Sequence, residues 1–275
     1  MTINCKGNLI DLSRPKVMGI LNVTPDSFFD GGRYNTQKAW LSQAEKMLQE
    51  GATFIDIGAY SSRPNADFVS EAEELRRIIP IVELLIKEFP NSLLSIDTFR
   101  SKVAKLCIEA GASIVNDISA GLLDDKMLDT VGTLHVPYIM MHMRGTPQTM
   151  QQLTDYDDLV KDISFYFSER IAEAKSKGIH DIIIDAGFGF AKTLSQNYEL
   201  LNNMELLNTL GRPMLVGISR KSMIYKLLDT SAAQALNGTT VLNTIALQKG
   251  ANILRVHDVK EAVECVKLIS EINPR

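Results

Sequence analysis

The sequence has few cysteines, no excess of basic residues and no long apolar run, and each absence excludes a class of protein. The 3 cysteines, Cys5, Cys107 and Cys265, are scattered, odd in number and without the spacing of a zinc site. A disulfide framework is therefore excluded as the basis of the fold. We expect free thiols in a reducing cytoplasm.

The charge balance argues against a polyanionic partner. The chain carries 29 basic and 33 acidic side chains, a net charge of −4, and no Lys/Arg run is dense enough to follow a phosphate backbone. No stretch approaches the roughly 18 consecutive apolar residues of a membrane span. The first residues lack the basic-then-apolar layout of a signal peptide. We therefore expect no nucleic-acid partner, no membrane partner and a cytoplasmic location.

Apolar runs of strand length alternate with amphipathic stretches of helix length along the whole chain. Its 275 residues are 45% hydrophobic, which is enough for a large core. We expect strands over 16–23, 53–58, 93–97, 113–117, 137–142, 181–185, 213–219 and 252–257. We expect helices over 36–50, 71–88, 101–110, 124–134, 157–177, 196–210, 221–228, 232–249 and 259–272. Glycine follows several of these helices, where a left-handed cap favours it.

This alternation predicts an α/β fold of parallel strands with crossover helices on the outside. Eight strand–helix units without a break in composition favour a closed (β/α)8 TIM barrel that spans residues 1–275 as one domain. A doubly wound open sheet is the alternative that the pattern alone leaves open.

Polar residues stand at the carboxyl ends of nearly all the expected strands. They are Asn22, Asp56, Asp97, Asn116, Asp117, His142, Asp185, Ser219, Arg255 and His257. In a closed barrel these ends meet on one face, where barrel enzymes place their sites. Carboxylates that converge on one mouth repel one another, so we expect a ligand to be held between them.

The stretch DAGFGFAK, residues 185–192, begins with a carboxylate directly after an apolar strand, and several of the residues that follow are small. Gly187 and Gly189 would let the backbone and Phe190 approach a flat ligand. A flexible loop without a ligand is the alternative. A dinucleotide fingerprint is not expected, because Lys192 stands where that motif needs a third glycine.

Eight motifs, in order from the first expected strand to the last, resemble those of the dihydropteroate synthase family. They are GILNVTPDSFFDGG (19–32), SSRP (61–64), SIDT (95–98), VNDI (115–118), MH (141–142), DAGFGFAK (185–192), GISRKS (217–222) and RVHDVKE (255–261). The resemblance implies a (β/α)8 barrel that acts as a transferase in folate biosynthesis. The family joins 4-aminobenzoate to (7,8-dihydropterin-6-yl)methyl diphosphate, which yields 7,8-dihydropteroate and diphosphate. It also implies Mg²⁺ as cofactor, sensitivity to sulfonamides and a homodimer.

By this resemblance, seven residues would bind the pterin: Asp97, Asn116, Ile118, Met141, Asp185, Phe190 and Lys221. A carboxylate accepts from two neighbouring N–H groups, and an amide both donates and accepts, which suits the edge of a pterin. Asp97 could instead cap the helix that begins near Ser101, and Met140 could take the place of Met141. Ile118, Met141 and Phe190 could equally be ordinary barrel interior.

The diphosphate would be bound by Asn22, Arg63, Arg255 and His257, and Asn22 would also bind Mg²⁺. Arg255 and His257 are two apart on one strand, so their side chains share a face. The aminobenzoate pocket would be lined by Phe28, Ser62, Pro64, Arg220 and Ser222, although Ser222 could instead cap a helix. The catalytic set would be Asp30, Lys221, Arg255 and His257, with Asp30 steadying a pterin cation. The loops NVTPDSFFDGGRY (22–34) and SSRPNA (61–66) would be mobile lids.

The second of these loops departs from the usual family pattern. Tyr60, Ser62 and Asn65 stand where Glu, Thr and Gly are usual, which bears on the aminobenzoate pocket and on drug sensitivity. Two other functions remain open: a pterin-binding module of a corrinoid methyltransferase, and a sugar-phosphate aldolase or isomerase that would use Lys221. TPDSFFDGG and SRKS favour the synthase, because they would serve the second substrate and the diphosphate.

Overall fold

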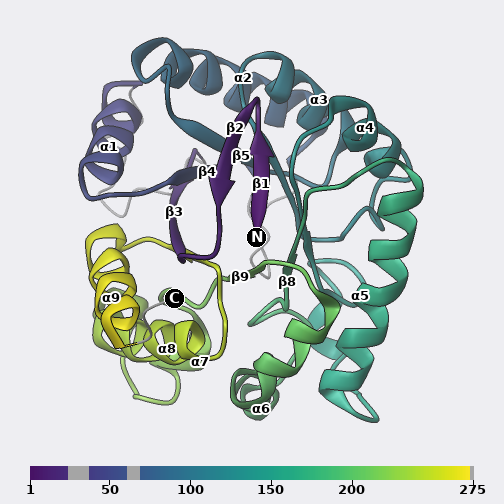
Figure 1. Ribbon diagram of the computed structural model, residues 1–275, viewed down its shortest axis with the longest axis vertical. Helices are drawn as coiled ribbons and strands as arrows, with labels where there is room; N and C mark the ends of the chain where they lie inside the picture. Colours follow the sequence, from purple (N-terminus) through teal and green to yellow (C-terminus); the bar gives the residue numbers. More distant parts are fainter. Residues whose placement is uncertain (24–36, 61–68, 273–275) are drawn as a thin grey trace.

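The computed structural model describes residues 1–23, 37–60 and 69–272. Parallel strands close into a barrel in the order β10-β3-β4-β5-β6-β7-β8-β9 (Figure 1). Their bounds are β3 (Lys16–Asn22), β4 (Phe54–Gly58), β5 (Leu93–Asp97), β6 (Ile114–Asp117), β7 (Tyr138–Met141), β8 (Ile182–Asp185), β9 (Met214–Val216) and β10 (Ile253–Val256). The prediction of a (β/α)8 barrel is confirmed, and the open sheet is excluded.

Helices surround the barrel in the ring seen in Figure 1. They are α1 (Gln37–Gln49), α2 (Glu71–Glu88), α3 (Ser101–Glu109), α4 (Met127–Leu134), α5 (Leu159–Ser176), α6 (Leu194–Asn203), α7 (Ser222–Tyr225), α8 (Leu236–Gln248) and α9 (Val259–Ile272). Short 3-10 helices lie at η1 (Met150–Gln152), η2 (Met204–Leu210) and η3 (Ala232–Gln234). The single helix expected over 196–210 is therefore two elements, α6 and η2. The strand expected over 213–219 ends already at Val216.

An antiparallel hairpin, β1 (Thr2–Cys5) and β2 (Asn8–Asp11), precedes the barrel and was not predicted. It lies across the centre of the ring in Figure 1. Its buried side chains pack against an apolar layer that the barrel strands supply, in one cluster of Ile3, Cys5, Leu12, Met18, Phe54, Ile114, Ile139, Ile183, Leu215 and Ile253. The hairpin therefore closes the amino-terminal end of the barrel.

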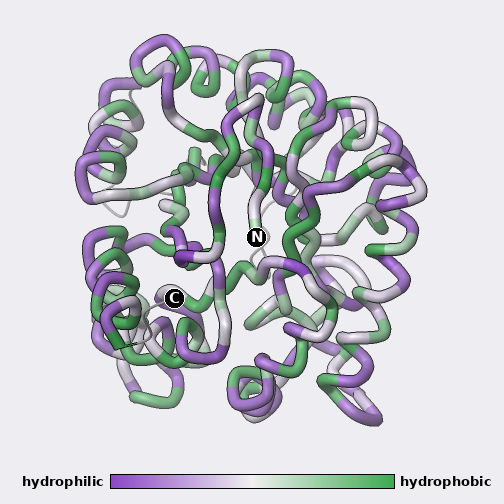
Figure 2. The backbone as a smooth tube through the Cα atoms, in the orientation of Figure 1, coloured by the Kyte–Doolittle hydropathy of each residue, from purple (hydrophilic) through white to green (hydrophobic). Residues whose placement is uncertain are grey.

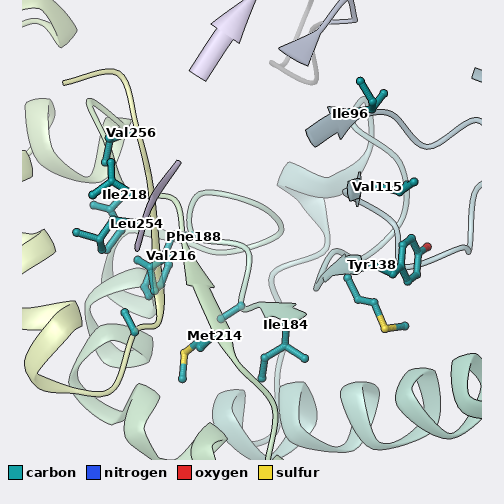
Figure 3. Packing of buried hydrophobic residues seen from close by; sticks show 14 of the residues in the cluster. Ile96, Val115, Tyr138, Ile184, Phe188, Met214, Val216, Ile218, Leu254 and Val256 are labelled. Carbon is teal, nitrogen blue, oxygen red and sulfur yellow. The ribbon is translucent and has the colours of Figure 1, made fainter. Parts of the chain in front are cut away.

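Side chains alternate along each strand between the barrel interior and the surrounding helices. The outward set forms the main core, and Figure 3 shows part of it, including Val115, Tyr138, Ile184 and Val216. Figure 2 shows hydrophobic residues along the central strands and hydrophilic ones over much of the outer ring. The inward set continues from the apolar layer toward the carboxyl ends of the strands, and there it becomes polar.

Candidate active site

The centre of the polar layer is an ion cluster around Arg255. Its guanidinium donates from Nε to Oδ2 of Asp56 and from Nη2 to Oδ2 of Asp97, both at 2.6 Å. The Asn116 amide donates to the same oxygen of Asp56 at 3.0 Å. Strands β4, β5, β6 and β10 thus bring four distant residues together. Nη1 of Arg255 has no hydrogen bond to the described residues, which leaves it for a ligand.

Asp97 belongs to this cluster, and the alternative that it caps the following helix is wrong. Helix α3 has no side-chain cap at Arg100, and the Ser101 N–H donates to Asp124 instead. Burial, together with the carboxylate of Asp56, raises the pKa of Asp97 to about 7 against the attraction of Arg255. The pKa of Arg255 is itself raised, because the two carboxylates outweigh the effect of burial, so the guanidinium stays charged.

Two buried oxygens in this layer lack a hydrogen-bond partner among the described residues. They are Oδ1 of Asp56 and Oγ of Ser95, on residues that are direct neighbours between β4 and β5. Almost all buried polar atoms in native proteins are paired with protein or ordered water. Unpaired oxygens at this point indicate a layer that is completed by a ligand or by water.

Asp185 and Lys221 face the same space from the next strands. Oδ1 of Asp185 accepts the Gly187 N–H at 2.8 Å, and burial raises the pKa of Asp185 against the nearby charge of Lys221. Lys221 Nζ donates to the Phe188 carbonyl at 2.5 Å and lies 4.8 Å from the centre of the Phe190 ring. Burial lowers the pKa of Lys221 to about 8, although Asp185 opposes the shift.

The glycines of DAGFGFAK are required by backbone geometry. Gly187 and Gly189 have φ of +69° and +82°, and a Cβ at Gly187 would lie 2.1 Å from the His142 carbonyl oxygen. Any side chain there would push the loop off strand β7. Lys192, to which the sequence assigned no role, is buried and donates to the carbonyls of Gly187 and Phe190, both at 3.0 Å.

The apolar residues predicted for the pterin faces form a cluster of their own. Ile118 and Met141 pack there with Met143, Met150 and Ala191, and Phe190 packs against them. Met140 lies in the outer core instead, so the choice between the two methionines falls to Met141. Their contact with a pterin stays a prediction.

His257 follows β10 and is held by Ser219. Ser219 Oγ accepts the His257 backbone N–H at 3.2 Å and lies 3.1 Å from its Nδ1. These two contacts from one hydroxyl fix the orientation of the imidazole ring. Ser219 was noted as a strand-end residue but not as part of the site.

Arg220 and Ser222 lie at the start of α7, and their contact with 4-aminobenzoate stays a prediction. The Arg220 guanidinium forms a two-point ion pair with Asp258, with both contacts at 2.8 Å, and also donates to the carbonyls of Ala232 and Ala233. Its head group is therefore held by these partners within the chain. Ser222 is the first residue of α7 and Lys221 caps that helix without a side-chain bond, so the alternative that Ser222 is the cap is wrong.

Two strand-end residues do not face the mouth, so the expectation that all of them converge there is wrong. The Asp117 carboxylate accepts from the backbone of Ser119 and Gly121 and from the Tyr138 hydroxyl at 2.6 Å. The His142 ring packs against Tyr166, with centroids 4.8 Å apart. Each follows an inward residue by one position, and successive side chains on a strand point to opposite faces.

Several predicted site residues lie outside the described residues: Phe28, Asp30, Ser62, Arg63 and Pro64. Asn22 is described, ends β3 and shares the inward face of Met18. No other described residue forms a hydrogen bond with its side chain, and the described ranges hold no group of three His, Cys, Asp or Glu residues that could bind a metal. A metal here would take one amide oxygen from the described residues.

The chain matches known proteins over nearly all of its length. Residues 18–257 match the pterin binding enzyme family. The dihydropteroate synthase of Escherichia coli K12 is 43% identical over 271 residues, which cover 98% of this chain and 95% of that protein. The crystal structure of the Yersinia pestis dihydropteroate synthase with a sulfonamide drug has a TM-score of 0.95 at 43% identity and full coverage of both chains. The Xanthomonas albilineans enzyme in complex with 7,8-dihydropteroate has a TM-score of 0.89 at 37% identity, again with full coverage of both.

Proposed function

The chain belongs to the dihydropteroate synthase family of pterin-binding enzymes, and we propose that the polar end of its barrel performs the family's reaction by losing diphosphate before the amine attacks. The enzyme condenses (7,8-dihydropterin-6-yl)methyl diphosphate with 4-aminobenzoate, giving 7,8-dihydropteroate and diphosphate in folate biosynthesis. The observation that supports the proposal is the placement of Arg255 and Lys221 around Gly217, on the same mouth as Asp97 and Asp185. One site then holds carboxylates that could bind the edge of a pterin and cations that could bind the leaving diphosphate.

The edge of the pterin would form hydrogen bonds with Asp185, Asn116 and Lys221. A buried carboxylate accepts from the amino group and the adjacent ring N–H, and Lys221 and the amide serve the carbonyl and ring nitrogens. Met141, Ile118 and Phe190 would pack against the ring faces. Asp97, through its ion pair, would hold Arg255 in place as well as accept from the pterin.

Arg255 and His257 would take up the charge that develops on the leaving diphosphate. Nη1 of Arg255, which makes no hydrogen bond to the described residues, would donate to it, and the imidazole of His257 would lie beside it. The electron-rich dihydropterin would stabilise the methylene cation, and the weak aniline nucleophile would then attack it. No covalent bond to the enzyme is required. Asp30 and Arg63 would assist from the two loops, as the family motifs imply.

Mg²⁺ fits the site as a partly protein-bound ion. Mg²⁺ usually keeps several waters and binds through one or two protein oxygens together with substrate phosphates. Asn22 would supply that protein oxygen at the end of β3, and the described residues hold no competing cage. When bound, the ion would neutralise charge on the diphosphate.

The second substrate would lie at the start of α7. Ser222 would bind the aminobenzoate carboxylate, with the stem of Arg220 beside it, and Phe28, Ser62 and Pro64 would close the pocket. A sulfonamide should compete with 4-aminobenzoate, because the Yersinia relative is solved with such a drug. Competitive inhibition against the amine, but not against the pterin, would support this assignment.

We propose that the enzyme works as a cytoplasmic homodimer. Its 3 cysteines are free and buried, which suits a reducing compartment. No helix within the described ranges is both long and apolar enough to span a membrane. Large apolar side chains are exposed at the carboxyl-terminal part of the ring: Leu227, Leu228, Val241, Leu268 and Ile272. Light scattering should give a dimer mass, and Leu228→Lys should lower it if these residues form the interface.

A series of substituted anilines tests the order of bond breaking. The chain is mixed with dihydropterin methyl diphosphate, Mg²⁺ and each amine, and the release of diphosphate is measured at saturation. If the carbon–oxygen bond breaks first, kcat should change little as the amine becomes less basic. A steep dependence of kcat on basicity would contradict the proposed route. Absence of any amine-dependent product would contradict the function itself.

A further inference from the structure

The loop between β8 and α6 is held from both sides by lysines. On the side of the mouth, Lys221 donates to the Phe188 carbonyl and approaches the Phe190 ring. On the opposite side, Lys192 donates to the carbonyls of Gly187 and Phe190 and lies 3.1 Å from Nδ1 of His142. Of the two lysines, only Lys221 reaches the space between Asp97 and Asp185.

The backbone of this loop is bonded at almost every position. The Gly187 N–H is held by Asp185, the Gly189 N–H by Asn197 at 2.6 Å, and the Ala191 carbonyl by Tyr156 at 2.8 Å. Lys192 differs from these partners, because its single ammonium binds two carbonyls of the loop and joins them to strand β7 through His142. The Phe190 N–H also donates to the Gly187 carbonyl at 3.1 Å, and Lys192 adds a side-chain bond to the carbonyl at each end of this turn.

The conformation that Lys192 holds is a demanding one. Gly187, Gly189 and Ala191 alternate as left-handed residues, and Ala191 has a φ of +48°, which is uncommon for a residue with a side chain. Lys192 is 8% exposed, and among the described residues its ammonium contacts two carbonyls and a ring nitrogen, with no carboxylate within hydrogen-bond distance. Burying an ammonium in this way opposes folding, so its bonds to the loop must offset a substantial cost.

We propose that Lys192 is a positioning residue for the pterin site, which sets the 187–190 turn so that Phe190 and the Asp185 carboxylate meet the pterin. It acts through the backbone and does not contact the substrate. The inference rests on the proposed function, because it assigns Asp185 and Phe190 to the pterin. It predicts a defect confined to one of the two substrates, which a general loss of stability would not produce.

The test compares Lys192→Met with Lys249→Met. Lys249 also binds a main-chain carbonyl, that of Asn202, and pairs with Glu205 at 2.9 Å, but it follows α8 near the amino-terminal end of the barrel. We expect Lys192→Met to raise KM for the dihydropterin diphosphate at least about 10-fold, to change KM for 4-aminobenzoate less than about 2-fold, and to lower kcat less than it raises the pterin KM. Lys249→Met should lower the unfolding temperature and leave both KM values unchanged.

Lys192→Gln provides the conservative variant, because an amide retains two N–H donors for the two carbonyls. Its pterin KM should lie between those of the unmodified chain and Lys192→Met. If Lys192→Met does not fold, the two KM values of Lys192→Gln are compared with those of the unmodified chain instead. An unchanged pterin KM, or equal changes for both substrates, in the folded variant overturns the inference. Absence of turnover by the unmodified chain overturns the proposed function and the inference with it, so the two failures are distinguishable.

Discussion

The two ends of the barrel interior differ by a single step of two residues along each strand. At the amino-terminal end the strands present Met18, Phe54, Ile114, Ile139, Ile183, Leu215 and Ile253, closed over by the hairpin. Two residues further on, the same inward face presents Ile20, Asp56, Asn116, Met141, Asp185, Gly217 and Arg255. The first layer is continuous apolar packing, and the second contains ions and amides. Stability and function are thus separated by about 6–7 Å of strand.

The two layers contribute to stability with opposite signs. Full burial of a large apolar side chain stabilises a fold by about 1.5–3 kcal/mol. A buried carboxylate or guanidinium must be desolvated, and a well-packed apolar group in its place is often at least as stabilising. Asp56 and Ser95 also carry oxygens with no partner among the described residues. The polar layer is therefore built for a ligand at the expense of stability.

Arg255→Ala should produce the largest effect, because it removes the centre of the polar layer. We expect kcat to fall by about 10²–10³-fold, the loss seen when one donor to a developing anion is removed. We also expect the free energy of unfolding to fall by about 3–5 kcal/mol, because Asp56 and Asp97 lose their shared counterion. Steady-state assays and urea denaturation measure the two. A rise in the pterin KM with kcat unchanged would contradict the assignment of Arg255 to the leaving group.

Phe54→Ala is the matching change one step below, on the same strand as Asp56. Loss of a fully buried ring should lower the free energy of unfolding by about 3–5 kcal/mol. Both KM values and kcat per folded molecule should stay within about 2-fold of the unmodified enzyme. Leu9→Ala, on the exposed side of the hairpin, serves as the control and should cost less than about 0.5 kcal/mol. A selective change in the pterin KM of Phe54→Ala would show that the layers are not separate.

The sequence predicted the barrel and the polar strand ends, because both follow from local periodicity. Eight expected strands matched the structure to within a few residues. The side chains that turn away were also open to prediction, since Asp117 must point opposite to Asn116 if the latter points inward. The hairpin was missed although Lys6-Gly7 separates two short alternating segments. Both residues have positive φ, +53° and +86°, as a two-residue hairpin turn requires.

The partners within the site could not be predicted from local pattern. Arg255 pairs with residues 199 and 158 positions away, and only closure of the barrel brings them together. The role of Lys192 depends on which carbonyls the left-handed turn presents to it. Its place at the end of a glycine-containing motif was visible, but the buried contact with His142 required the positions of two separate loops.

Raising the pH should have a smaller effect on the pterin KM, because deprotonation of Lys221 removes a charge but leaves the side chain in place. Lys221 is protonated below its pKa of about 8 and neutral above it. Pterin affinity should therefore fall several-fold as pH rises from 7 to 9, and Lys221→Met should abolish this dependence while raising KM at pH 7. The KM for 4-aminobenzoate serves as the internal control. A pterin KM that improves across this range would contradict the assignment.

Stability should move in the opposite direction over the same range. The folded-state pKa of Lys221 lies below the ordinary lysine value of 10.5, so the folded chain releases this proton before the unfolded chain does. The unfolded state then binds more protons, and the free energy of unfolding rises between about pH 8 and pH 10. Lys221→Met should remove that rise. At the polar end, the protonated lysine serves binding and opposes folding, and denaturation measured at two pH values tests the claim.

The smallest effect should come from loosening the amino-terminal end. Cys5 ends β1 with its side chain on the buried face of the hairpin, and burial, with the neighbouring charge of Asp181, raises the pKa of its thiol to about 12. It should not react with a thiol reagent at pH 8 until the hairpin detaches, since the thiolate is the reactive form. Ile3→Ala should speed labelling of Cys5 while Cys107, buried in α3 with a pKa also raised to about 12, stays unreactive. Both KM values should be unchanged. Altered kinetics in this variant would mean that the apolar layer transmits the state of the hairpin to the site, whereas labelling without altered kinetics would show that the barrel interior separates them.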